Sequence, residues 1–138
     1  ENIVFVPGIN NVIGIEWRLI EVRSSVETAA SRFSRQELAE LGMEDAYTLR
    51  FDKERISGLA APNRYFAPYE EGEGKALSIG VIGGTLMAAF REPESLNERE
   101  YFGCLENTVA WDLIQNQLQL HTRDGQGGEA VLVFEAGS

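Results

Sequence analysis

Apolar and polar side chains alternate with a period of two over several short stretches of the chain. The alternation is clearest in residues 15–19, 47–52, 77–81 and 109–113. Such a pattern is typical of strands that bury one face. We expect further strands at 64–69, 85–90, 118–120 and 130–135, with Gln115 and Asn116 forming the turn of a hairpin.

Two segments have helical signals instead. Ser34 and Glu37 have the spacing of a capping box, and Gly42 stands where a helix would end. Pro93 precedes Ser95, which has Glu98 three residues later, and this predicts a second helix. An apolar stripe at helical spacing follows Ser95 and includes Leu96, Phe102, Leu105 and, close by, Tyr101 and Val109. A further helical turn is expected at 26–33.

The order of these elements predicts an α+β protein that is mostly β. Short connections favour antiparallel pairing, so we expect a strongly curved antiparallel sheet, or a partly closed barrel-like roll, with one or two helices covering an open end. A chain of 138 residues supports one hydrophobic core. We assign residues 1–14 to an N-terminal arm or lead-in, and 15–138 to the domain.

Two segments resemble signatures of a known family. Residues 56–69 read ISGLAAPNRYFAPY, and residues 79–90 read IGVIGGTLMAAF. Together with the order of elements over about 15–135, they resemble the META (HslJ-like) domain family. The chain has Pro62 and Ala89 where that family often has cysteine, and its segment 24–43 is longer than the family requires.

The resemblance implies an envelope-associated or secreted domain, linked to stress or antibiotic tolerance and without an enzymatic activity common to the family. Because the chain begins at Glu1 without methionine, we expect an export signal or a longer N-terminal region to have been removed. The resemblance therefore favours an exported protein, in the periplasm, on the outer membrane as a lipoprotein, or secreted.

The charge balance narrows the class of partner. The chain has 22 acidic and 12 basic side chains, a formal charge of −10. Such a field repels phosphate backbones, so we expect no nucleic-acid partner. Its longest apolar stretches are broken by glycines, so we expect no transmembrane segment in the chain. The sequence gives no oligomeric state.

The sequence offers no catalytic, metal or cofactor cluster. His121 is the single histidine, and the alternation turns it toward solvent, opposite Leu118 and Leu120. The single cysteine, Cys104, lies on the apolar side of the second helix, where we expect a buried, inert thiol. The acidic tip at 70–74 lacks the spacing of calcium loops. We therefore expect a domain that is not an enzyme and needs no cofactor or metal.

One polar and aromatic patch is a candidate interaction surface. It comprises Asn63, Arg64, Tyr65, Thr85 and Met87. Arginine and tyrosine are enriched at binding surfaces, whereas Asn63 has a plain structural role available, since asparagine tolerates positive φ and bonds its own turn. The expected partner is an unidentified protein or, alternatively, a small apolar ligand or lipid held in the mouth of the barrel.

Overall fold

The computed structural model describes residues 12–24, 35–42, 44–60, 63–85, 98–123 and 129–137. These residues form nine strands and two helices. In chain order they are β1 (Glu16–Ser24), α1 (Arg35–Glu40), β2 (Thr48–Phe51), β3 (Arg55–Leu59), β4 (Arg64–Glu71), β5 (Leu77–Ile79), β6 (Gly83–Gly84), α2 (Glu98–Glu106), β7 (Thr108–Ile114), β8 (Gln117–Arg123) and β9 (Glu129–Ala136).

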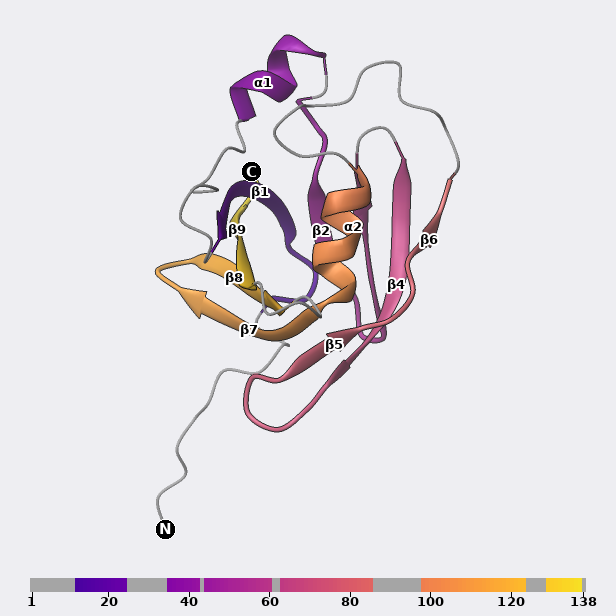
Figure 1. Cartoon of the computed structure of the whole chain (residues 1–138), viewed down its shortest axis with the longest axis vertical. Coiled ribbons are helices and arrows are strands. Elements are labelled where there is room, and N and C mark those ends of the chain that lie inside the picture. Colours follow the sequence, from indigo (N-terminus) through magenta and orange to yellow (C-terminus); the bar gives the residue numbers. More distant parts are fainter. Residues whose placement is uncertain are drawn as a thin grey trace.

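The strands form one antiparallel sheet in the order β5-β4-β3-β2-β1-β9-β8-β7, with the two-residue β6 paired to β4. Because β1 pairs with both β2 and β9, the first strand joins the two halves of the sheet. The sheet curls until its two edge strands approach each other beneath α2 (Figure 1). The predicted fold class is therefore confirmed: a mostly β protein whose antiparallel sheet is nearly closed into a barrel with one seam.

The seam between β5 and β7 is bridged next to β5, at Ala76. Ala76 and Ala110 form an isolated antiparallel bridge, and the Trp111 N–H donates to the Lys75 carbonyl at 3.0 Å. The Lys75 ammonium lies 5.2 Å from the centre of the Trp111 ring and donates to Asp112 Oδ1 at 2.8 Å. This hydrogen bond lowers the pKa of Asp112. Backbone, aromatic and ionic contacts thus hold the edges together.

The interior of the roll is filled with aromatic and aliphatic side chains. The helix α2 contributes Tyr101 and Leu105, and α1 contributes Leu38. The largest fully buried side chains of the strands and loops are Trp111, Tyr47, Phe51, Phe134, Leu19, Leu49, Ile56, Leu77 and Leu118. Since α2 places two buried side chains inside the sheet, it is part of the core rather than a surface cover.

Most of the predicted strands are confirmed. The segments 15–19, 47–52, 64–69, 118–120 and 130–135 fall on β1, β2, β4, β8 and β9, and their apolar positions are mainly buried. Gln115 and Asn116 both have positive φ, 52° and 67°. This is the backbone conformation of a type I′ hairpin turn, so the predicted turn is also confirmed.

The helical signals are confirmed where the structure describes them. The first helix is followed by Gly42 with φ 76°, a left-handed residue that closes a helix end. Phe102 and Cys104 of α2 are partly buried against the core. Ser34, Ser95, Leu96, the turn at 26–33 and most of the strand expected at 85–90 lie outside the described residues.

Two valines at predicted inward positions are exposed instead. Val81 is 83% exposed, because β5 ends at Ile79 and the chain leaves the ladder before β6. Val109 is 46% exposed, because a bulge between Thr108 and Ala110 leaves it without a partner on β8. An extra residue in one strand reverses the face of the residues beside it, which a period of two cannot reveal.

The end of the predicted N-terminal lead-in packs on the domain. Val12 is fully buried and its carbonyl accepts a hydrogen bond from the Trp17 indole at 3.2 Å. Ile13 forms a parallel bridge with Phe51. These contacts attach 12–14 to the β1–β2 side of the barrel.

The single thiol should be unreactive in the folded protein. Burial raises the pKa of Cys104 to about 11, which leaves little thiolate at neutral pH. We expect its reaction with a small disulfide reagent to be on the order of 100-fold slower than that of an exposed cysteine. Measuring the rate in buffer and again in denaturant tests this, and equal rates in the two conditions would contradict it.

Candidate functional site

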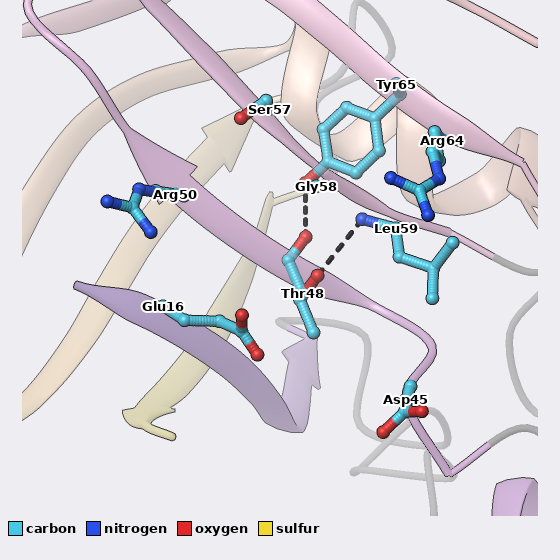
Figure 2. Close-up of a pocket in the computed structure, with 9 residues that line it drawn as sticks. All are labelled: Glu16, Asp45, Thr48, Arg50, Ser57, Gly58, Leu59, Arg64 and Tyr65. Atoms are coloured by element: carbon cyan, nitrogen blue, oxygen red, sulfur yellow. Dashed lines mark hydrogen bonds between the residues drawn. The ribbon is translucent and has the colours of Figure 1, made fainter. Parts of the chain in front are cut away.

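A pocket of about 440 Å³ lies on the outer face of the barrel, over strands β1 to β4. Thr48 and Arg50 come from β2, Ser57 and Leu59 from β3, and Arg64 from β4. Two carboxylates, those of Glu16 and Asp45, complete the charged rim (Figure 2). We refer to this hollow as the Thr48 pocket, because Thr48 lies between the carboxylates and Arg64.

The backbone just before the pocket has an unusual conformation. Tyr47 is fully buried and has φ 60°, in the left-handed region that bulky residues rarely adopt. Such strain costs about 1–3 kcal/mol and persists only where the surrounding contacts impose it. The next carbonyl, that of Thr48, is bonded by side chains inside the barrel, and the Leu59 N–H of β3 bonds the Thr48 hydroxyl instead.

Inside the barrel this carbonyl accepts from two phenols. The Tyr65 hydroxyl donates to it at 2.6 Å, and the Tyr101 hydroxyl lies at 3.3 Å. The two hydroxyls are 2.8 Å apart and hydrogen-bonded to each other. On the β3 side, the Leu59 N–H donates instead to the Thr48 hydroxyl at 3.0 Å (Figure 2). The ladder between β2 and β3 therefore opens at Thr48, under the pocket.

Gly58 makes room for this arrangement. A Cβ at this position would lie 2.1 Å from the Thr48 carbonyl oxygen and 2.8 Å from the Tyr65 hydroxyl. No other residue could occupy the position without moving backbone atoms. The signal that marks the glycine as essential is therefore the close approach of two strands, which is not visible in the sequence.

Arg35 fixes the same segment from the end of the barrel. Its guanidinium donates to the carbonyls of Ala46 at 2.7 Å and Leu19 at 3.3 Å, and also to that of Glu44. Partial burial lowers the pKa of Arg35, yet an arginine remains charged at neutral pH. The Leu19 N–H donates to the Tyr47 carbonyl at 3.0 Å. Together these bonds hold the strained tyrosine from both sides.

The tyrosine pair is electrically neutral at ordinary pH. Burial raises the pKa of both Tyr65 and Tyr101. The rings also pack closely, with centroids 5.7 Å apart and planes nearly perpendicular. Their hydroxyls act as hydrogen-bonding groups within the core, where a phenolate would be strongly disfavoured.

Some residues of the predicted interaction surface are hydrogen-bonded to one another. The Thr85 hydroxyl donates to Asn63 Oδ1 at 2.8 Å, and the Arg64 N–H donates to the Thr85 hydroxyl at 3.1 Å. Asn63 also donates to Glu98 of α2, from its backbone at 2.6 Å and from its side-chain nitrogen at 2.8 Å. Asn63 thus ties β4 to the first turn of α2.

Only some of those residues face solvent. Arg64 and Thr85 are exposed, whereas Asn63 and Tyr65 are buried, and Met87 lies outside the described residues. The positive φ considered for Asn63 is not observed, since the described non-glycine residues with positive φ are Tyr47, Gln115 and Asn116. Its polar groups bond Glu98 and Thr85 instead. Arg64 and Tyr65 are the members of the candidate surface that also line the Thr48 pocket.

Other candidate chemistry is dispersed. His121 is half-buried on β8, between Ala110 and Val131 of the adjacent strands. The tip residues Glu70, Glu71 and Glu73 are exposed, and no group of three potential metal ligands gathers within the described ranges. As far as the chain is described, neither helix has the length and apolar character needed to cross a bilayer.

A family model confirms the resemblance drawn from the sequence. The META domain model matches residues 10–137, nearly the whole chain. The chain belongs to the META-domain family. A search of curated proteins found no match to it.

Two solved structures share the fold of this META domain. A protein from Burkholderia xenovorans, determined by NMR, is 20% identical, with a TM-score of 0.64 over 100% of this chain and 96% of that one. A DUF4847 family protein from Bacteroides vulgatus, determined by crystallography, is 10% identical, with a TM-score of 0.56 over 90% and 94% of the two chains. At these identities the similarity establishes the fold alone.

Replacing Gly58 by alanine should strongly destabilise the META domain. The new methyl group would collide with the Thr48 carbonyl oxygen, so we expect a loss of about 3 kcal/mol or more in the free energy of unfolding. Chemical denaturation monitored by tryptophan fluorescence measures this loss.

Gly103→Ala is the matched control. Gly103 lies within α2, and a Cβ there would meet nothing within 4 Å. Since alanine is the better helix former, this variant should be unchanged or more stable by about 0.5–1 kcal/mol. Equal losses in both variants would show that Gly58 has no special role.

Stability should also fall at alkaline pH because of the buried phenols. Unfolded tyrosines ionise near pH 10, whereas the pKa of Tyr65 and Tyr101 is raised in the folded state. The contribution of the two phenols to the free energy of unfolding is fully present below the pKa of the unfolded tyrosines. It is lost as the pH rises above that value, by up to ~1.4 kcal/mol per pH unit for each phenol. Denaturation curves across this range should show the decline, with a shallower slope for a Tyr65→Phe, Tyr101→Phe double variant.

Proposed function

We propose that this META domain is a noncatalytic binding domain that acts in the cell envelope or as a secreted protein, with the outer face of β1 to β4 as its recognition surface. The observation that carries the proposal is the Thr48 pocket, where the open β2–β3 ladder lies under a charged rim. Family membership supports the envelope and stress-related setting that the sequence resemblance implies.

The distribution of charge supports this choice of surface. Although the chain has a formal charge of −10, the outer face of β2 to β4 presents Arg50, Arg55 and Arg64, all exposed. The Arg55 guanidinium lies 5.7 Å from the centre of the half-exposed Phe66 ring. Arginine beside an exposed aromatic ring is a combination enriched at binding surfaces.

The state of the buried nucleophiles favours binding over catalysis. Tyr65, Tyr101 and Cys104 have raised pKa values because they are buried. Each is therefore protonated at neutral pH, whereas a catalytic nucleophile needs activation.

The alternative function is that of a carrier for a small apolar ligand or lipid in the barrel mouth. One observation favours it: the Trp111 indole N–H is buried and has no hydrogen-bond partner among the described residues. A guest with an oxygen acceptor would satisfy this donor. Native mass spectrometry of the purified protein separates the two functions. A lipid adduct would support the carrier function, and a chain without an adduct would contradict it.

Complementation tests the binding function. Cells that lack the gene should become more sensitive to envelope stress or antibiotics, and the native chain should restore tolerance. An Arg50→Gln, Arg64→Gln double variant should fail to restore it, because both replaced side chains line the pocket. Arg123→Gln, an exposed change on β8, is the control and should restore it fully. Full rescue by the double variant would remove the recognition surface from the proposal.

A further inference from the structure

The Thr48 pocket carries both signs of charge, and its two carboxylates lie apart from Arg64. Glu16 belongs to β1 and Asp45 precedes β2, whereas Arg64 belongs to β4, three strands from β1 and two from β2 in the sheet. Arg50 lies between them, opposite Glu16 across the β1–β2 pair and opposite Ser57 across the β2–β3 pair. Figure 2 shows the carboxylates on one side of Thr48 and Arg64 on the other.

The two arginines of the pocket are only weakly paired within the protein. No carboxylate within the described residues lies at ion-pair distance from Arg64, and the only one at that distance from Arg50 is Asp52, at 3.9 Å. The Arg50 and Asp52 side chains are about half exposed, so their attraction is weak in water. Both guanidinium groups therefore keep most of their hydrogen-bonding capacity for a ligand.

We propose that the Thr48 pocket binds a small zwitterion, a ligand with a carboxylate and an ammonium group such as a short peptide with free ends. The carboxylate of the ligand lies against Arg64, and its ammonium group lies against Glu16 and Asp45. This assignment rests on the binding function proposed above and adds the class of ligand.

Charge complementarity selects this class over simpler ions. A plain anion would be attracted by the arginines but repelled by the two carboxylates. A plain cation would be attracted by the carboxylates but repelled by the arginines. Only a ligand with both charges satisfies the two ends of the pocket at once. The volume of about 440 Å³ lies within the range of small-molecule sites.

Isothermal titration calorimetry with triglycine tests the proposal. The native protein should bind triglycine, and the same peptide with an acetylated amino end or an amidated carboxyl end should bind about tenfold more weakly or worse, since each loses one charge-assisted contact. Absence of triglycine binding, or equal binding of the three peptides, would overturn the assignment.

Variants assign the two ends. Arg64→Gln should weaken binding of triglycine and of its acetylated form at least about tenfold. Glu16→Gln should reduce the preference for triglycine over the acetylated peptide. Arg123→Gln, on β8, removes one positive charge as Arg64→Gln does, and it should leave triglycine binding unchanged. An equal loss of binding in this control would indicate unspecific electrostatic attraction and would contradict the site. Thermal unfolding confirms that each variant is folded.

The outcomes separate this inference from the function on which it rests. If triglycine does not bind but the Arg50→Gln, Arg64→Gln variant still fails in complementation, the surface functions with another class of ligand and the zwitterion is excluded. If triglycine binds as expected but the variant complements fully, the pocket is real and its role in stress tolerance is wrong.

Discussion

The carbonyl of Thr48 is the group on which the centre of this structure depends. A backbone oxygen turned into an apolar core requires donors, and here Tyr65 and Tyr101 supply them. Tyr101 can do so only because α2 enters the barrel, and the carbonyl can turn inward only because Tyr47 adopts positive φ and Gly58 has no side chain. One peptide group thus joins the sheet, the helix and a strained turn.

The same peptide group shapes the exterior. When the Thr48 carbonyl leaves the ladder, Leu59 turns to the Thr48 hydroxyl, and the sheet surface above becomes hollow. Arg50, Ser57 and Arg64 are then the outward neighbours of that hollow by the ordinary alternation of the strands. A requirement of the core and the form of the surface therefore have one cause, and selection on either would constrain the other.

The sequence predicts the elements of this fold better than their partners. Alternation, the Gly42 helix end and the Gln115–Asn116 turn are local signals, and the structure confirms them apart from the exposed Val81 and Val109. The bulge at Val109 belongs to a pair of strands, so no single segment reveals it. For the same reason Asn63 resembled a turn residue, although it bonds Glu98, 35 positions away. Along β4, however, the alternation predicts that Tyr65 faces the interior when Arg64 faces solvent, so the two side chains do not belong to one exposed surface.

Long-range and short-range electrostatics act differently on a ligand that approaches the pocket. The overall charge of −10 repels anions at a distance, but at physiological salt this repulsion is screened beyond about 8 Å. Close to the surface, the arginines and carboxylates of the rim dominate. A ligand with no net charge feels no repulsion on approach and still meets paired charges on arrival. An acidic domain with a mixed-charge pocket is therefore suited to zwitterions, and the same argument disfavours phosphate-rich partners on this face.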